Sequence, residues 1–465
     1  MKFTPTKLTR RFMSMLLAAL MGLTLTAPFS PVGLRAAGAA QVTDEKKIIV
    51  FSDPHYYAPE LGTTGSAFEK YLAADTKLLA ESDASLRKTV DTIKASNAGI
   101  VLIPGDLTKD GEMVSHQKVA SYLKELEDSG KKVYVINGNH DINNPEAYSY
   151  SGDTVTPVPS VSPADFKELY KDFGYAEALA VDPDSMSYVV EPVKGLRIIV
   201  MDSALYDNNY AKGTPVIAGA LSEGRLSWIL QQTAIAKAEG KTVLGMMHHG
   251  LTDHFTVQRQ LFGEYVISDA DSIASALADA GMQAVFTGHF HAQDIAAGQG
   301  GDKEIYDIET GSLLTYPNPF RTIEVTGHNK LKITTDKLES INYDTGGLTF
   351  PDFAKAFIVK GLKLQSPQLL AGLLVQQGMP PEQAMAAAED LANQEVAPAL
   401  TIRDLMVTVM LAHYQGDEAV DPQIISVIQY LSASNDPLQR MLGGALLSLS
   451  TDLTPEDNDV ILKLK

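Results

Sequence analysis

The stretch VYVINGNHD at residues 133–141 joins an apolar, β-branched run to a turn of Gly, Asn, His and Asp. A short apolar run bounded by turn-forming residues is typical of a buried strand. The side chains that follow it, Asn139, His140 and Asp141, are of types that bind metals or transfer protons. This stretch predicts a buried strand that presents polar groups at its carboxyl end.

The same arrangement occurs four more times along the chain. Apolar runs at residues 47–52, 99–104, 241–247 and 284–287 lead into Asp53-Pro54-His55, Gly105-Asp106, His248-His249 and Gly288-His289-Phe290-His291. Helix-period segments lie between the runs, at Phe68–Ala95, Glu112–Ser129, Ala164–Phe173, Ser222–Ala238 and Asp271–Ala280. This alternation predicts an α/β fold, and hairpin-like patterns at Ser187–Met201 and Glu304–Leu338 add antiparallel strands. We therefore expect two packed sheets flanked by helices.

The residue types at the ends of these runs point to metal chemistry. Six of the ten histidines of the chain fall in these motifs. Imidazole and carboxylate groups suit Mn, Fe or Zn, and a carboxylate such as Asp106 can bridge two ions. The chain contains no cysteine, which excludes disulfides, thiolate zinc sites and cysteine nucleophiles. Any metal must therefore be held by nitrogen and oxygen.

Taken in order, the blocks D-x-H, G-D, G-N-H-D, H and G-H-x-H from Asp53 to His291 resemble those of the calcineurin-like metallophosphoesterase superfamily. The resemblance covers residues 45–340 and implies a two-layer β-sandwich flanked by helices, with a dinuclear metal centre at one end. It implies that one metal ion, Mn, Fe or Zn, is held by Asp53, His55, Asp106 and His291. The other ion would be held by Asp106, Asn139, His248 and His289. His140 is then the catalytic residue beside the phosphate, and His249 and Asp141 are expected to face substrate or support the site.

Residues 105–112, GDLTKDGE, distinguish between branches of this superfamily. Purple acid phosphatases carry Tyr where this chain has Lys109, and protein Ser/Thr phosphatases read G-D-x-V-D-R-G. The block looks more like the bacterial branch that contains class III cyclic-nucleotide phosphodiesterases. That branch usually follows its His-His pair with Pro, whereas this chain has Gly250, which puts the shape of the substrate loop in question.

The resemblance implies hydrolysis of phosphodiesters, a class that includes cyclic nucleotides, by a metal-bridging hydroxide. One alternative is an exported phosphomonoesterase or nucleotidase, and another is a non-catalytic metal-containing protein that binds a cell-surface partner. The net charge of −19 argues against a nucleic-acid duplex as partner. The expected partner is a phosphate-ester small molecule, and no protein partner is predicted.

The two ends of the chain differ from its centre. Lys2, Lys7, Arg10 and Arg11 precede an apolar stretch at 12–27 and small residues at 36–40, which predicts a signal peptide over residues 1–40 cleaved near Ala40. We expect an exported protein, secreted, periplasmic or at the cell surface, with no membrane anchor in its mature form. A catalytic domain is expected over 41–345 and an all-helical domain over 346–465. Its helices are predicted to begin at Ser366-Pro367, Asp421-Pro422, Asp436-Pro437 and Thr454-Pro455.

For several other polar residues, the sequence predicts positions at the surface, in packing contacts or beside the site. We expect His116 and His254 to be exposed to solvent, and His413 to lie in a helix–helix contact. Arg321 is expected either to line a substrate wall or to extend from a sheet into solvent. Asp202-Ser203 would form a strand-end turn or support the site.

Overall fold

The computed structural model describes residues 46–73, 75–300, 303–327 and 329–464. The predicted signal peptide lies outside these residues. Among the helices of the described part, none is long and apolar enough to cross a membrane.

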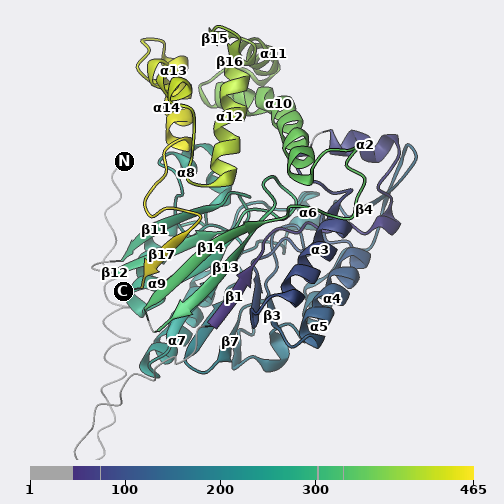
Figure 1. Ribbon diagram of the computed structural model, residues 1–465, viewed down its shortest axis with the longest axis vertical. Coiled ribbons are helices and arrows are strands. Elements are labelled where there is room, and N and C mark those ends of the chain that lie inside the picture. Colours follow the sequence, from purple (N-terminus) through teal and green to yellow (C-terminus); the bar gives the residue numbers. More distant parts are fainter. Residues whose placement is uncertain (1–45, 74, 301–302, 328, 465) are drawn as a thin grey trace, which may run out of the picture. The chain divides into compact units, whose positions relative to one another are not determined.

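The first sheet carries three of the predicted site segments. Its strand order is β17-β14-β13-β1-β2-β3 within the described residues. β1, β2 and β3 are parallel, and the remaining neighbours are antiparallel (Figure 1). Its strands are β1 (Lys46–Val50), β2 (Ile100–Ile103), β3 (Lys132–Val135), β13 (Pro319–Thr326), β14 (Lys330–Lys337) and β17 (Val460–Lys463).

The second sheet carries the other two site segments. Over the described residues its order is β11-β12-β10-β9-β8-β7-β6, with β8, β9, β10 and β12 parallel. Its strands are β6 (Ala180–Val181), β7 (Tyr188–Val193), β8 (Leu196–Val200), β9 (Thr242–Met246), β10 (Ala284–Thr287), β11 (Asp294–Gly300) and β12 (Lys303–Glu309). A separate hairpin pairs β4 (Tyr148–Ser151) with β5 (Thr154–Pro157).

The two sheets share one hydrophobic core. Leu244 and Met246 of β9 pack in the same cluster as Ile48 and Val50 of β1. Val243, which directly precedes Leu244, belongs instead to a cluster with residues of helices α7 and α9. This alternation follows from the two-residue period of a strand, and it puts one face of β9 between the sheets and the other under helices. The expected two mixed sheets with flanking helices are confirmed.

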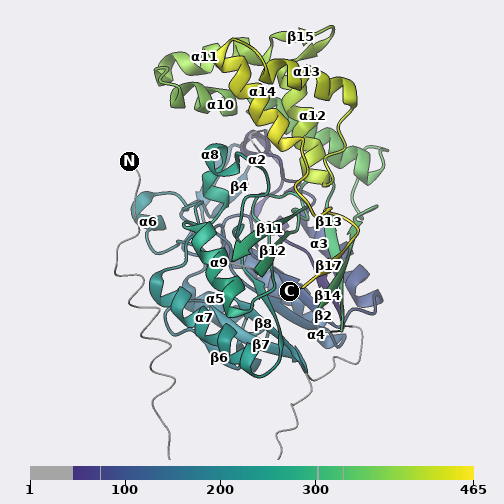
Figure 2. The ribbon, with the colours of Figure 1, turned by 90° about the vertical axis from the view of Figure 1, so that its left-hand side faces the viewer.

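The helices that precede residue 300 flank the sheets or lie in the connections between strands (Figures 1 and 2). They are α2 (Ser66–Leu72), α3 (Ser82–Ala95), α4 (Met113–Asp128), α5 (Pro163–Leu169), α6 (Asn209–Lys212), α7 (Glu223–Ala238), α8 (Gln258–Leu261) and α9 (Ala270–Ala280), with short 3₁₀ turns at Pro59–Leu61, Tyr175–Glu177 and Gly263–Tyr265. The predicted helix Phe68–Ala95 is wrong at residues 75–81, which lie between α2 and α3. Asp75 accepts hydrogen bonds from the backbone of Thr76 and Lys77 there, so a local turn replaces the helix.

The C-terminal region contains five helices in its described residues: α10 (Phe350–Gln376), α11 (Pro381–Ala392), α12 (Ile402–Gln415), α13 (Pro422–Ser432) and α14 (Pro437–Leu449). Asp421 and Asp436 cap α13 and α14 as predicted. The other two Pro-based starts are wrong. Pro367 lies inside α10, where the Ser366 hydroxyl donates to the Leu362 carbonyl, and no helix begins at Pro455.

The expectation that residues 346–465 are all helical is also wrong. β15 (Glu395–Ala397) and β16 (Leu400–Thr401) form a small hairpin, and β17 returns to the first sheet beside β14. The apolar side chains of β17 alternate, so that Leu462 joins the core shared by the sheets while Ile461 is exposed. The chain thus ends on the sheet after forming the helices, and the division into two domains stays a prediction.

Arg321 of β13 ties the two sheets and the C-terminal segment together. Its guanidinium donates to the backbone carbonyls of Glu309 (2.7 Å), Asp294 (3.3 Å) and Asp457. The side chain is fully buried, so the expectation of a solvated or substrate-facing arginine is wrong. A guanidinium can be buried here because carbonyls from three separate segments satisfy its donors.

We predict that Arg321→Met destabilises the protein by at least about 3 kcal/mol, because three buried carbonyls lose their donor and the nearby carboxylates lose a positive charge. Urea unfolding measures this. Lys330→Met, at an exposed position of β14, is the control and should change stability by less than about 0.5 kcal/mol. Equal effects of the two substitutions would contradict the assigned role.

Candidate metal centre

The predicted site segments converge at the carboxyl ends of parallel strands. Asp53 and His55 follow β1, Asp106 follows β2, and Asn139 follows β3. His248 follows β9 and His289 and His291 follow β10, in the opposite sheet. Parallel strands end at the same edge of a sheet, so residues far apart in sequence become neighbours.

One group of potential ligands surrounds the end of β1. The Nε2 atoms of His55 and His291 lie 3.0 Å apart. Asp53 Oδ1 is 3.8 Å from His55 Nε2 and 3.5 Å from His291 Nε2, and Asp106 Oδ2 is 3.7 Å from His55 Nε2. Two imidazole nitrogens that face each other among carboxylates are arranged as ligands of a shared cation.

A second group shares Asp106 with the first. His248 Nε2 lies 3.2 Å from Asp106 Oδ2 and 3.0 Å from Asn139 Oδ1. The ligand atoms of Asp106, His248 and His289 all fall within 4.8 Å of one another. His248 Nδ1 donates to the Pro104 carbonyl at 2.9 Å, which leaves Nε2 free to bind a metal. Asp106 is therefore the one carboxylate common to both groups.

The potential ligand atoms are better placed to bind metal ions than to hydrogen-bond to one another. His289 Nε2 and His55 Nδ1 are buried without a hydrogen-bond partner. Burial holds the pKa of both His55 and His289 well below the usual value, so each ring is neutral and keeps a lone pair for a metal. Burial opposes ionisation of Asp106, but the neighbouring His248 and His140 hold its pKa well below the usual range. Neutral imidazoles around a carboxylate are the donor set that two divalent ions require.

The backbone is strained where the ligands lie. Asp53, His55, Asp106, His289 and His291 all have φ between 35° and 77°. Such conformations cost non-glycine residues on the order of 1–3 kcal/mol each and persist only where the surrounding structure enforces them. Gly138 contributes through space instead, because a Cβ there would lie 2.1 Å from Asp106 Oδ1. The loops are thus held in the one arrangement that brings their side chains together.

His140 lies on the side of the site that solvent reaches. Its side chain is 24% exposed and that of His291 is 15% exposed, whereas the other predicted ligands are buried. The His140 ring is 5.1 Å from that of His55, and its backbone N–H donates to Asp106 Oδ1 at 2.9 Å. A molecule approaching the metal-ligand groups would therefore meet His140 first.

Asp110 orients His140, a role that the sequence did not indicate. His140 Nδ1 donates to Asp110 Oδ1 at 2.8 Å, and the Asp110 carboxylate also pairs with the buried Lys109. Although burial disfavours its charged form, the carboxylates of Asp106 and Asp110 raise the pKa of His140 to about 9. The two carboxylates thus favour the form of His140 that carries protons on both nitrogens and can donate from Nε2.

Asp141 and His249 support the site without facing it. Asp141 accepts hydrogen bonds from the backbone of Leu107, Thr108 and Gly138, so it joins the loops after β2 and β3. His249 contacts Ser203 Oγ at 2.8 Å and the Ile217 carbonyl at 2.8 Å. With both ring nitrogens engaged by protein, His249 has a supporting position, and Ser203 supports it in turn.

Lys77 adds positive charge near the site and was also missed. It follows the turn at Asp75, to which its Nζ is paired at 3.2 Å, and Leu78 N donates to the Leu314 carbonyl beside Thr315. Thr315 Oγ1 in turn contacts His291 Nδ1 at 3.3 Å. Burial lowers the pKa of His55 and Asp106 raises it. Lys77 has the next largest effect on this pKa and lowers it. Nothing in the sequence indicated that Lys77 lies near the site, because the helical pattern predicted for Phe68–Ala95 includes residue 77.

The two histidines expected to be solvent-exposed are buried. His116 contacts Tyr170 OH at 2.7 Å and the Asp141 carbonyl at 3.0 Å, so it braces the loop after β3. His254 pairs with Asp294 at 2.7 Å beneath the C-terminal helices. His413, predicted to lie between helices, packs instead against the rings of Phe255 and Phe290 outside the C-terminal region.

Comparisons with known proteins identify the family of the chain and several solved structures to which it is similar. Residues 46–293 match the family described as calcineurin-like phosphoesterase. A dimetal phosphatase from Danio rerio matches with 14% identity and a TM-score of 0.46, over 62% of this chain and 95% of its own. The purple acid phosphatase PPD1 from yellow lupin seeds matches with 12% identity and a TM-score of 0.40, over 63% of this chain and 52% of its own. No curated protein sequence matches.

We predict that Gly138→Ala removes most of the bound metal, because the added methyl group displaces Asp106 from both ligand groups. Elemental analysis after reloading with Mn²⁺ measures the loss. Gly99→Ala is the matched control, since a Cβ there meets nothing within 4 Å. Full metal content in Gly138→Ala would show that Asp106 is not held as described.

Proposed function

The chain belongs to the calcineurin-like phosphoesterase family, and from this we propose that it is an exported phosphodiesterase with a dinuclear centre. Metal-dependent phosphoester hydrolysis follows from the family and from the buried His and Asp clusters. Diester preference, export and the residue roles are the parts we propose. The observation that carries the proposal is the pair of ligand groups sharing Asp106.

Two ions would be held by the residues already described. Asp53, His55, His291 and Asp106 would bind one, and Asp106, Asn139, His248 and His289 the other. Such ions, when bound, acidify a water and neutralise charge on the phosphoryl oxygens. The ions can be Mn, Fe or Zn, since all three accept this mixture of nitrogen and oxygen donors.

The protein residues supply the remaining requirements of the reaction. His140, protonated and held by Asp110, can donate a proton to the oxygen that leaves phosphorus. Asp141 and the backbone N–H of His140 fix the loops that carry Asp106 and Asn139. Lys77 favours an anionic substrate locally, which matters because the chain as a whole carries a net charge of −19.

The preference for diesters rests on residues 105–112 and on their placement. GDLTKDGE places Asp110 four residues after Asp106, with Lys109 buried among the rings of Tyr57, Tyr71 and Tyr150. The Lys109 ammonium group therefore points away from the metal-ligand groups. It can neither bind a metal nor contact the terminal phosphate of a monoester substrate directly. A phosphomonoesterase or nucleotidase is the alternative, and a comparison of mono- and diester turnover decides between them.

We predict that the wild-type protein hydrolyses bis-p-nitrophenyl phosphate with Mn²⁺ and that Asp106→Asn lowers kcat/KM by at least about 10³-fold, because both ligand groups lose their shared charge. p-Nitrophenyl phosphate should turn over more slowly than the diester. Release of p-nitrophenol, with and without chelator, measures both. Turnover unaffected by chelator and by Asp106→Asn would overturn the mechanism, and faster monoester turnover would overturn the diester preference.

We predict that Asp110→Asn lowers kcat by about 10–100-fold, because His140 loses the carboxylate that orients and charges it. The decrease should be larger for diphenyl phosphate than for bis-p-nitrophenyl phosphate, since the poorer leaving group depends more on a proton donor. Asp172→Asn, at an exposed position, is the control. Equal losses on both substrates would contradict proton donation by His140.

A further inference from the structure

A second set of metal-ligand side chains lies apart from the dinuclear groups. It comprises Asp294 at the start of β11, His413 in the last turn of α12, and Glu418 in the turn that follows. Their ligand atoms all lie within 4.8 Å of one another, and all three residues are buried. None of the three has a part in the reaction proposed above.

The spacing of these atoms suits one small cation. His413 Nδ1 is 2.7 Å from Glu418 Oε1 and 3.7 Å from Asp294 Oδ2. Ligands at about 2.05 Å from a tetrahedral ion are separated by about 3.3 Å. The two observed distances lie on either side of that value, so modest side-chain rotation would surround an ion.

Two buried polar atoms of the set, His413 Nε2 and Glu418 Oε2, have no hydrogen-bond partner. Glu418 Oε2 makes no hydrogen bond, although the Glu418 side chain is only 3% exposed. Its companion oxygen, Oε1, contacts His413, so Oε2 belongs to a carboxylate directed into the set. A buried carboxylate oxygen without a donor is costly, and a bound cation removes that cost.

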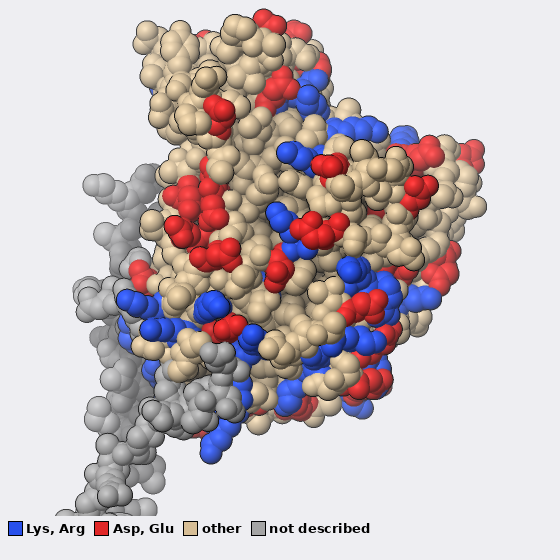
Figure 3. Space-filling model, in the orientation of Figure 1, with Lys and Arg blue, Asp and Glu red and all other residues tan. Residues whose placement is uncertain are grey.

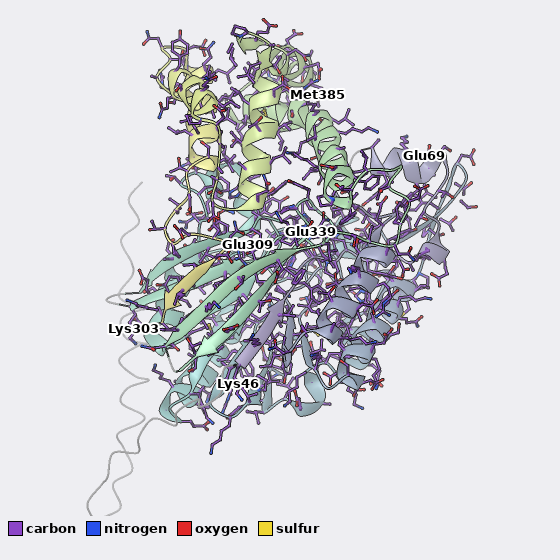
Figure 4. The ribbon with its side chains drawn as sticks, in the orientation of Figure 1. Lys46, Glu69, Lys303, Glu309, Glu339 and Met385 are labelled. Carbon is purple, nitrogen blue, oxygen red and sulfur yellow. The ribbon has the colours of Figure 1, made fainter. Side chains whose placement is uncertain are left out.

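Further acidic side chains surround the set. Asp417, Asp452 and Asp457 form a neighbouring group, and acidic side chains gather on this face where the chain passes from α14 to β17 (Figure 3). Glu309, which lies where the sheets meet the helices, adds another carboxylate (Figure 4). Of the basic groups nearby, Arg321 donates to backbone carbonyls, and His254 pairs with Asp294 Oδ1, which leaves Asp294 Oδ2 as the oxygen that faces His413. Burial, followed by Asp294, Asp452 and Asp417, raises the pKa of Glu418 to about 9.

We propose that Asp294, His413 and Glu418 bind a third divalent metal ion, of the zinc or manganese class, which fastens the C-terminal helices to β11. One imidazole and two carboxylates are a donor set that both metals accept. The ion would join residues more than a hundred positions apart in sequence. It would also hold the segment after His291, since Asp294 lies three residues beyond that ligand.

Metal counting on the full chain tests this proposal. The protein is stripped with chelator, reloaded with Mn²⁺ or Zn²⁺ alone, dialysed, and analysed for metal per chain. We expect three equivalents in the wild type and two in Glu418→Gln, which should keep its phosphoesterase activity. Glu456→Gln, an exposed carboxylate of the same region, should retain three. Two equivalents in the wild type, or equal counts in the wild type and Glu418→Gln, would overturn the proposal.

A second measurement separates this site from the dinuclear centre. In an Asp106→Asn background, adding Glu418→Gln should remove one further equivalent and abolish the rise in Tm caused by metal. If neither the metal count nor the Tm shift changes, the third site is overturned, and this holds even if Glu418→Gln alone folds poorly. Loss of catalysis with the third equivalent intact would contradict only the proposed function.

Discussion

The shared carboxylate of Asp106 is the constraint on which the rest of the structure depends. Imidazoles from both sheets approach it, through His55 on one side and His248 on the other. Buried carboxylates and imidazoles crowded together in this way are unfavourable unless cations bind between them. The strained loops, the close approach of Gly138 and the pairing of parallel strands all serve to bring these groups to one place.

The C-terminal helices are connected to this centre through packing. Phe290, between His289 and His291, belongs to the same hydrophobic cluster as residues of α10, α12 and α14. The rings of Phe290 and His413 lie 5.5 Å apart. Because one side of the β10 loop faces the metal groups and the other faces the helices, the helices help to fix the position of two ligands. The third ion that we propose would strengthen the same connection.

The convergence of the predicted site segments could be expected from the sequence, because each segment lies directly after a short apolar strand. Because parallel strands end at the same edge of a sheet, locating the strands is enough to predict that the residues after them lie close together. These residues are Asp53, Asp106, Asn139, His248 and His289. Asp110 was missed because its partner, His140, is thirty residues away and their contact depends on how the loop after β2 turns. Lys77 was missed because helical periodicity continued through a turn that Asp75 imposes.

The wrong predictions concern polar residues whose burial depends on distant partners. Arg321, His116 and His254 are typical surface residues by type, yet each is buried because carbonyls or carboxylates from other segments satisfy it. β17 was not foreseen for a similar reason, since its strand character depends on the free edge of β14. Local pattern predicts elements and strand-end motifs, whereas these partnerships arise only from the folded arrangement.

Electron paramagnetic resonance of the Mn²⁺-loaded Glu418→Gln variant tests the central claim most directly, because that variant should hold only the two ions at Asp106. If Asp106 bridges them, the spectrum should show two exchange-coupled Mn²⁺ ions, and the coupling should vanish in the additional Asp106→Asn variant. A spectrum of isolated Mn²⁺ ions with Asp106 intact would contradict a shared carboxylate and the dinuclear centre built on it.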